Sequence, residues 1–342
     1  MRVLMDGRIL SAAPSGVRDI ALGMVKGFRQ LVEAGELELI IAGTTPRGSE
    51  HSSDTLLRSK PFMHLALPVA ASRLGADRIF VPRQTRPLLS LVPTVSLIHD
   101  IGFFRAPDLY PRRSPIAVTT HLAVRSKRLL SVSGFTSDEL CSQRLFEHAT
   151  PLPIQAIHSV EWSPTHESRY LLCVAAQEPH KNLVRLVEAW STAQTEGFDL
   201  VICGRTGEGS EALSNVISSS SKRESVRVVS GLSDDAYLRQ LAECWGYIQP
   251  SLYEGLCIPA LDAAAGGTPS VLSSLGNLGV VFKNAPAKQV FDPLSVQDMA
   301  LSIEAVLSDE GFRSASSDWN RRHISQTDWR DVARAALQGM RW

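Results

Sequence analysis

The sequence predicts an α/β fold, and three of its features lead to this prediction. Short runs rich in β-branched residues and leucine alternate with helical patterns along almost the whole chain, which is typical of parallel sheets covered by helices on both faces. The length of 342 residues exceeds that of a usual single domain. A polar, turn-rich stretch near residues 150–168 interrupts the pattern, so we expect two α/β halves of similar size.

The elements follow in order along the chain. After a first strand, apolar residues recur at three- and four-residue spacing from Val17 to Val32, which predicts a long amphipathic helix. Ser137 could cap a helix that ends at Thr150, and Thr327 is expected to cap the last helix, over residues 327–338. The other expected strands are Leu37–Ala42, Thr94–Ile98, Leu129–Ser133, Leu171–Val174, Leu200–Cys203, Val226–Val229, Tyr247–Gln249 and Ser270–Leu272.

Composition excludes several classes of protein. Lys and Arg together number 35, as do Asp and Glu, so the basic field that nucleic-acid binders use is missing. No apolar run reaches the length of a membrane span, and the N-terminus has no signal-peptide core, so we expect a cytoplasmic protein. The five cysteines form no Cys-x-x-Cys pair, which favours buried reduced thiols over disulfides or metal ligands.

The segment from Pro250 to Pro269 is the most informative one. Pro259 suits the first turn of a helix, and Gly266 or Gly267 can end it. A glycine-containing loop that enters a helix just after a strand is a natural anion site, and it lies at the strand end where open α/β sheets bind ligands.

This segment resembles the signature of the retaining GT-B glycosyltransferases, family 4 in particular, in which two acidic residues eight apart flank a Gly-x-Gly-x-Pro-like turn. The resemblance implies that Glu254 contacts the donor sugar and that the backbone of Gly255, Leu256 and Cys257 approaches the sugar and phosphates. It implies that Asp262, where the family normally has Glu, holds the ribose. An ordinary loop–helix connection with a surface acid is the alternative.

A second segment, Ala175–Leu183, resembles the family's Gly-x-x-x-x-Pro-Arg-Lys-Asn stretch, whose basic pair neutralises the donor diphosphate. Lys181 matches the lysine, while His180 replaces the arginine and carries full charge only when protonated. Such a cation is needed because the leaving diphosphate gains negative charge as the glycosidic bond breaks. The alternative for Lys181 is a solvated side chain at a helix start.

Further matches lie elsewhere in the chain. His99 and Asp100 follow a strand and resemble the family's His-Asp segment, where the histidine lies against the donor sugar. Gly16 matches a glycine of the loop beside the diphosphate; Arg18 follows, but Asp19 replaces the usual aromatic residue. The serine-rich turn from Ser131 to Ser137 is interpreted as a helix cap, and Gly231 and Leu232 fall where the family places a turn against the nucleotide base.

Other chemistries find little support. Gly204–Gly209 has the wrong spacing for a dinucleotide fingerprint, and Glu208 within it opposes phosphate. There is no His-x-x-x-His pair, acidic metal cluster, P-loop or Gly-x-Ser-x-Gly elbow, so we expect no bound metal and no cofactor other than the nucleotide-sugar co-substrate.

The resemblance covers nearly the whole chain and implies two Rossmann-like domains facing each other across a cleft. Residues 1–160 would bind the acceptor, residues 161–325 the nucleotide sugar, and residues 326–342 would return to the first domain. The implied function is retaining, metal-independent transfer of a hexose to a saccharide acceptor, free or linked to undecaprenyl diphosphate, in surface-polysaccharide assembly. GDP-mannose is the first donor expected, before UDP-glucose and dTDP-rhamnose.

Two alternative functions and one basic surface are also compatible with the sequence. A non-catalytic GT-B partner subunit fits the departures at Asp19, His180 and Asp262, and an epimerase or phosphorylase of the same fold is a further enzyme alternative. The first half has a local basic density that could contact a lipid-linked acceptor at the inner face of the membrane or could simply be a solvated surface: Arg105, Arg112, Arg113, Arg125, Lys127 and Arg128.

Overall fold

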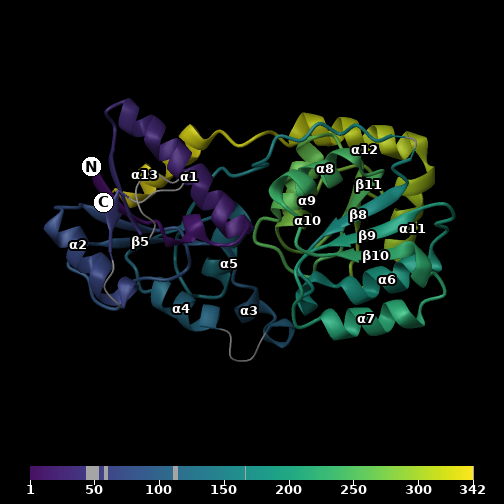
Figure 1. The fold of residues 1–342 in the computed structure, drawn as a ribbon, viewed down its shortest axis with the longest axis horizontal. Coiled ribbons are helices and arrows are strands. Elements are labelled where there is room, and N and C mark those ends of the chain that lie inside the picture. Colours follow the sequence, from purple (N-terminus) through teal and green to yellow (C-terminus); the bar gives the residue numbers. More distant parts are fainter. Residues whose placement is uncertain (44–53, 58–60, 111–114, 166, 342) are drawn as a thin grey trace. The chain divides into compact units, whose positions relative to one another are not determined.

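The computed structural model describes residues 1–43, 54–57, 61–110, 115–165 and 167–341. Two of the arginines in the basic density, Arg112 and Arg113, lie outside the described residues. The chain divides into two compact units (Figure 1). Unit 1 comprises residues 1–105, 113–154 and 327–342, and unit 2 comprises residues 106–112 and 155–326.

Unit 1 is built on a seven-stranded parallel sheet in the order β3-β2-β1-β4-β5-β6-β7. The order reverses between β1 and β4, so the loops that follow these two strands open a crevice at the carboxyl edge. The strands are β1 (Arg2–Asp6), β2 (Glu38–Gly43), β3 (Thr55–Leu56), β4 (Arg78–Val81), β5 (Thr94–Ile98), β6 (Arg128–Ser131) and β7 (Thr150–Pro151).

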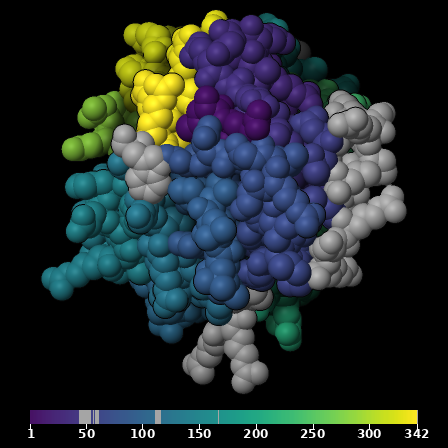
Figure 2. Space-filling view, turned by 90° about the vertical axis from the view of Figure 1, so that its left-hand side faces the viewer, coloured from purple at the N-terminus to yellow at the C-terminus, as the bar shows by residue number. Residues whose placement is uncertain are grey.

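Helices of unit 1 connect these parallel strands. The longest, α1, buries the stripe of apolar residues that its periodicity predicts, including Ile20, Met24 and Phe28. The yellow helix α13, from the end of the chain, lies beside the purple α1 (Figures 1 and 2). The α-helices of unit 1 are α1 (Gly16–Glu33), α2 (Leu67–Arg73), α3 (Gly102–Arg105), α4 (Pro115–Ala123), α5 (Gly134–Ser142) and α13 (Trp329–Met340).

Two predicted caps are wrong by a few residues. Ser133, not Ser137, caps α5 by accepting a hydrogen bond from the amide of Thr136, while Ser137 Oγ donates to the carbonyl of Ala149. Asp328, not Thr327, caps α13. The helix α5 also ends at Ser142, so residues 150–151 are a strand and not its continuation.

Unit 2 repeats the same architecture with a six-stranded parallel sheet in the order β10-β9-β8-β11-β12-β13. Its order reverses between β8 and β11, where a second crevice is expected. The strands are β8 (Tyr170–Val174), β9 (Asp199–Cys203), β10 (Val226–Val229), β11 (Gly246–Gln249), β12 (Ser270–Ser273) and β13 (Val290–Phe291).

Helices cover both faces of the second sheet. The core on one face packs around the fully buried Trp190 of α6, with α11 against it, and α9 packs against α12 (Figure 1). The α-helices are α6 (Leu183–Thr192), α7 (Ser210–Ser219), α8 (Asp234–Glu243), α9 (Ile258–Ala265), α10 (Gly276–Val281), α11 (Val296–Ser308) and α12 (Glu310–His323). The α/β class predicted from strand–helix alternation is therefore confirmed. In each unit the strand order runs outward in both directions from one switch point, which lies between β1 and β4 in unit 1 and between β8 and β11 in unit 2.

Candidate active site

Lys181 and Glu254 meet at the switch point of unit 2. Lys181 stands on a 3-10 turn after β8, and Glu254 stands on the loop after β11, so neighbouring strands deliver them to the same sheet edge. Lys181 Nζ lies 2.8 Å from Glu254 Oε1, and the two side chains are 19% and 10% exposed. The two residues that carry the strongest sequence signal are thus in direct contact.

A chain of hydrogen bonds supports the carboxylate from inside the unit. Ser251 Oγ donates to Glu254 Oε1 at 2.7 Å, and Gln249 Nε2 donates to Ser251 Oγ at 2.7 Å. Tyr247 OH in turn donates to Gln249 Oε1 at 2.5 Å. Burial alone would raise the pKa of Glu254, but the charge of Lys181 and the hydrogen bonds from Lys181 and Ser251 outweigh it, so the pKa lies below its ordinary value. The carboxylate is therefore ionised, and a ligand with hydroxyl groups would find an acceptor there.

The turn after Glu254 is held in an unusual backbone conformation. Cys257 has φ +66°, in the left-handed region that glycine prefers, at the position where the family pattern has its second glycine. Gly276 approaches so closely that a Cβ on it would lie 2.7 Å from the amide nitrogen of Glu254. Asn277 donates from its amide to the carbonyl of Glu254 and from its side chain to that of Leu256. Sequence reasoning missed Gly276 and Asn277, because nothing local marks residues twenty positions away as supports of this turn.

His180 is neutral. Its ring stacks on Tyr110 with centroids 4.6 Å apart, and its backbone carbonyl accepts from the amide of Leu252. Burial, followed by the neighbouring charge of Lys181, lowers the pKa of His180 to about 3. It therefore supplies no positive charge near neutral pH.

Asp262 lies inside α9 with no exposed surface. Its Oδ1 accepts from the amides of Ile157 and His158 at 2.8 and 3.0 Å. Its Oδ2 lies 2.7 Å from His158 Nδ1 and 3.1 Å from the hydroxyl of Tyr237. The ribose-binding role stays a prediction, and in this structure the carboxylate anchors residues 157–158, where unit 2 begins.

Three further residues predicted to bind the sugar donor lie in a loop or at the start of a helix. Gly231 follows β10 with φ +74° and open space around it, and Leu232 next to it is half-buried. Gly16 is the first residue of α1 in unit 1, where Ser15 caps the helix. The structure places Gly231, Leu232 and Gly16 at strand or helix ends without assigning any of them a ligand.

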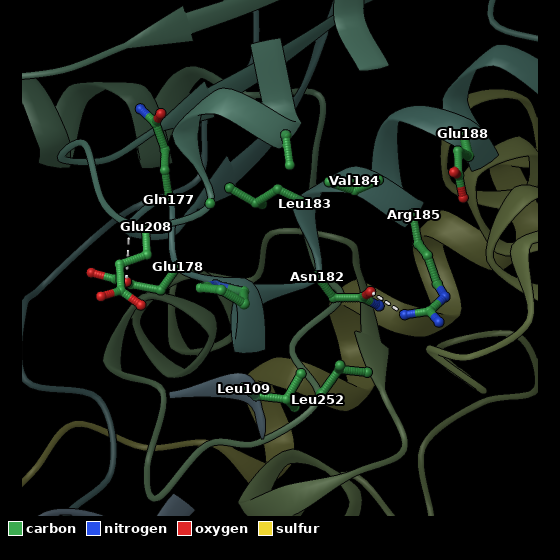
Figure 3. Close-up of a pocket in the computed structure, with 13 residues that line it drawn as sticks. Leu109, Gln177, Glu178, Asn182, Leu183, Val184, Arg185, Glu188, Glu208 and Leu252 are labelled. Carbon is green, nitrogen blue, oxygen red and sulfur yellow. Dashed lines mark hydrogen bonds between the residues drawn. The ribbon is translucent and has the colours of Figure 1, made fainter. Parts of the chain in front are cut away.

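A cavity of about 430 Å³ lies next to the Lys181 turn, between α6 and the start of α7 (Figure 3). Asn182 at its wall has φ +60° and donates from its side chain to the carbonyls of Pro250 and Pro293, so it joins the loop after β8 to those after β11 and β13. The close-up shows Glu178 and Glu208 side by side, with the amide of Glu208 donating to the Glu178 carboxylate at 3.3 Å. Three carboxylates, those of Glu178, Glu188 and Glu208, make this cavity unsuited to a diphosphate.

Unit 1 has its own cavity at the carboxyl edge of its sheet, also of about 430 Å³, and His99 lines it. His99 Nε2 lies 3.0 Å from the carbonyl of Pro82, which places the ring proton on that nitrogen and leaves Nδ1 as the acceptor. Burial lowers the pKa of His99 to about 4, so the ring is neutral near pH 7. Arg8 and Arg83 line the same cavity and share the buried carboxylate of Asp6. Sequence reasoning missed both arginines, although Arg8 lies within the N-terminal loop that it singled out.

Asp100 braces the loop after β5. Its carboxylate accepts from the amide of Gly102 at 3.2 Å, and Gln84 Oε1 accepts from the amide of His99 at 3.1 Å. Among the described residues, no group of three or more His, Cys, Asp and Glu side chains is placed to hold a metal ion. In the same part of the chain, every helix is too short or too polar to span a bilayer.

Comparison with known sequences identifies a domain in the second unit. Residues 156–323 match the family model described as glycosyl transferases group 1. The O-antigen chain mannosyltransferase B of Escherichia coli is 24% identical over 262 residues, which cover 69% of this chain and 66% of that protein. A serotype-specific mannosyltransferase, WbdA of Escherichia coli, is 24% identical over 227 residues, and only 27% of it is covered. The chain thus spans two thirds or less of these relatives.

Solved structures share the fold over nearly the whole chain. A sucrose-phosphate synthase from Thermosynechococcus elongatus superposes with a TM-score of 0.74 at 13% identity, covering 98% of this chain and 97% of that one. Anabaena Alr3699/HepE, solved in complex with UDP and glucose, gives a TM-score of 0.73 at 15% identity, covering 99% and 98%. The predicted GT-B fold is therefore confirmed, and unit 2 carries the domain of the group 1 glycosyl transferases.

Proposed function

We propose that the protein transfers a hexose, with retention of configuration and without a metal ion, from a nucleotide-diphosphate sugar to a saccharide. The observation that carries the proposal is the buried pair of Lys181 and Glu254 at the switch point of unit 2. An ionised carboxylate and a lysine in contact suit a ligand that has both sugar hydroxyls and a diphosphate.

Each member of the pair has a distinct proposed role. Lys181 would turn toward the diphosphate and stabilise the negative charge that develops as the bond between C1 of the sugar and the leaving oxygen breaks. Glu254, held by Ser251, would accept hydrogen bonds from the sugar hydroxyls and fix the position of the ring. The acceptor hydroxyl would approach C1 from the same face that the diphosphate leaves, which retains the configuration. It would form the new bond to C1 and give its proton to the leaving diphosphate. Glu254 is thus a positioning group and not a nucleophile.

The other predicted residues complete the proposal. Gly255, Leu256 and Cys257 would present backbone amides to the sugar and phosphates, and Gly231 and Leu232 would lie against the base. In unit 1, Gly16 would lie beside the diphosphate, and the neutral His99 would contact the donor sugar. Each of these roles rests on the resemblance, and none depends on a titrating group near pH 7.

The donor and acceptor are proposed from chemistry and relatives together. GDP-mannose is the first donor proposed, since the curated relatives reported above are named mannosyltransferases. UDP-glucose is the second, because a protein of the same fold was solved with UDP and glucose, and dTDP-rhamnose is the third. The acceptor proposed is a saccharide, free or linked to undecaprenyl diphosphate, in surface-polysaccharide synthesis at the cytoplasmic face of the membrane.

Thermal shift against UDP, GDP, dTDP and ADP without added metal tests the donor site. A nucleotide that binds only the folded state stabilises it by about 2.7 kcal/mol at a hundred times its dissociation constant. One of the four nucleotides should raise the melting temperature of the protein. Lys181→Met should abolish this shift, whereas Lys283→Met, at an exposed lysine, should keep it. If no nucleotide shifted the melting temperature, a non-catalytic partner subunit would be favoured. The neutral His180 and the Asp262 carboxylate, which is hydrogen-bonded within unit 2, are also compatible with that alternative.

Turnover then separates the enzyme classes. With the nucleotide identified, Glu254→Ala should reduce transfer from the matching sugar nucleotide by at least about a hundredfold, a loss of roughly 2.7 kcal/mol in transition-state stabilisation. The anomeric configuration of the product, read by NMR, tests retention. Unchanged transfer by the Glu254→Ala variant would remove this residue from the site, and conversion of the donor without an acceptor product would indicate an epimerase.

A further inference from the structure

A second cavity in unit 1 lies at the opposite edge of the sheet from His99. It has a volume of about 680 Å³ and is bounded by residues 126–128, just before and at the start of β6, and by residues 141–148 at the end of α5. His99 follows the carboxyl end of β5, which runs parallel to β6, so about one strand length, roughly 13 Å, separates the two regions. The cavity is therefore distinct from the cavity that His99 lines.

Positive charge dominates the walls of this cavity. Lys127, Arg128 and Arg144 line it, and Glu147 is the one carboxylate among its lining residues. Lys127 and Arg128 also make other contacts, but their charges contribute to the field in the cavity. Phe146 adds an apolar surface beside these cations. The lining thus suits an organic anion better than a neutral or cationic ligand.

A buried hydroxyl in the wall lacks a partner. Ser126 is only 4% exposed, and among the described residues its Oγ has no hydrogen-bonding atom within reach. Buried polar atoms are nearly always satisfied, and a hydroxyl left without a partner is destabilising. Ser126 lines the cavity, and although its Oγ has no accessible surface, a rotation about χ1 could bring the hydroxyl to an oxygen atom of a ligand there.

Arg144 has a backbone conformation that costs free energy. It has φ +54° and takes the position after the C-cap of α5, where glycine is usual. The amide of Leu145 donates to the carbonyl of Leu140, and that of Arg144 donates to Cys141, which is the hydrogen-bond pattern of a glycine-terminated helix. An arginine here adds strain to the turn and brings a guanidinium to the cavity wall.

We propose that this cavity binds the phosphate group of an organic ligand and serves as an anchoring site separate from the transfer site. The guanidinium of Arg144 would bind two phosphate oxygens in bidentate fashion, and Ser126 would donate to one of them or, in a monoester, to the third. Phe146 would contact the organic part of the ligand. The phosphate can belong to a soluble ester or to a phospholipid headgroup, and the two sources are distinguished by the test.

The exposed thiol of Cys141 reports on the site without any mutation. It lines the cavity, while the other four cysteines of the chain are buried. The rate of its alkylation by iodoacetamide is measured with increasing glycerol 3-phosphate, with inorganic phosphate, and with vesicles of phosphatidylglycerol or phosphatidylcholine. Sodium chloride at matched ionic strength controls for screening. We expect glycerol 3-phosphate to slow alkylation at least threefold if the source is soluble, and phosphatidylglycerol vesicles alone to do so if it is a headgroup.

Two variants and a matched control tie the effect to the named residues. Arg144→Gly should abolish the protection and should not lower the melting temperature, since glycine relieves the strained turn. Ser126→Ala should weaken the protection at least threefold and should not lower the melting temperature, because it removes a buried hydroxyl that lacks a partner. Lys288→Gly removes an exposed lysine with φ +70° in unit 2 and should leave the protection intact. Three results would overturn the proposal. Sodium chloride could slow the alkylation of Cys141 as much as the phosphate compounds do, neither phosphate source could slow it, or both variants could keep full protection.

Discussion

At the scale of single residues, the contact between Lys181 and Glu254 shows how a charged site can be stable before a ligand arrives. Removing two charges from water is costly, and the attraction between them offsets this cost only when the geometry is good and other hydrogen bonds assist. Here Ser251 and Gln249 supply those bonds to Glu254. The same arrangement keeps the carboxylate ionised, as positioning of sugar hydroxyls requires.

A double-mutant cycle measures the strength of this contact. Lys181→Met and Glu254→Gln should each destabilise unit 2, because each leaves a partly buried group without its partner, and their coupling should be about 2 kcal/mol in denaturant unfolding. The control is the exposed pair of Arg227 and Asp199, whose side chains are 58% and 40% exposed, and its coupling should stay below about 1 kcal/mol. Equal couplings in the two pairs would mean that solvent screens the Lys181 pair as well.

Asp262 allows a test that separates a structural from a ligand-binding role. Asp262→Asn places an amide where donors from residues 157 and 158 and from Tyr237 converge, so we expect a loss of about 2–4 kcal/mol in unfolding free energy. Hydrogen exchange at the amides of Ile157 and His158 should quicken. Unchanged stability and exchange, together with weaker nucleotide binding, would instead assign Asp262 to the ribose.

At the scale of elements, the contact of α1 with α13 depends on two glycines inside a helix. A Cβ on Gly23 would lie 2.1 Å from the ring of Trp329, and one on Gly27 would lie 1.9 Å from its carbonyl oxygen. Glycine within a helix costs about 1 kcal/mol relative to alanine. The cost is offset because α13 can approach the backbone of α1 at these positions and bury Trp329.

Gly27→Ala should therefore destabilise unit 1 despite the better helix propensity of alanine. We expect a net loss of about 2 kcal/mol, because the overlap with the Trp329 carbonyl forces the two helices apart. Gly134→Ala in α5 is the matched control, since no atom lies within 4 Å of its added Cβ, and it should be neutral or slightly stabilising. Thermal unfolding of both variants checks this, and a stabilised Gly27→Ala variant would contradict the close approach.

Elements with strong periodicity could be predicted from the sequence, and elements defined by tertiary pairing could not. The strand Thr94–Ile98 has the predicted bounds, because a buried run of five residues, all apolar or β-branched except Ser96, suffices to define it. The two-residue strands β3 and β7 exist only through pairing with β2 and β6, and no local pattern marks them. The caps at Ser133 and Asp328 were misplaced because several serines, threonines and aspartates cluster there, and only backbone geometry selects one.

In the candidate site, too, some residues could be predicted from the local sequence and others depend on tertiary contacts. Lys181 and Glu254 could be singled out from the sequence because each lies in a segment that resembles a family motif, while their direct contact follows from the pairing of β8 with β11. The supports at Gly276 and Asn277 come from the next strand–helix connection, so their role depends on tertiary contact. The neutrality of His180 follows from burial against Tyr110, which lies seventy residues earlier in the chain and belongs to unit 2 by packing alone.

At the scale of the whole molecule, each unit contains a histidine that its surroundings keep neutral, His99 in unit 1 and His180 in unit 2, so acid should weaken both. The folded-state pKa is about 4 for His99 in unit 1 and about 3 for His180 in unit 2, below the ordinary value near 6.5. Below pH 6.5 the unfolded chain binds a proton at each histidine that the folded unit does not bind. Stability contributed by neutral histidine is therefore complete above pH 6.5 and is lost progressively as the pH falls toward 4 and 3.

Between pH 7 and pH 5 this linkage should lower the unfolding free energy of each unit by up to about 2 kcal/mol, since both histidines are partly exposed. Denaturant unfolding of the whole chain at several pH values measures the two losses, and His99→Gln and His180→Gln should each flatten the slope of one transition. The exposed His148→Gln variant should leave both slopes unchanged. If both histidine variants kept the full slope, carboxylates and not these rings would control acid stability. If each flattens one transition only, the two units unfold independently, as their separate cores predict.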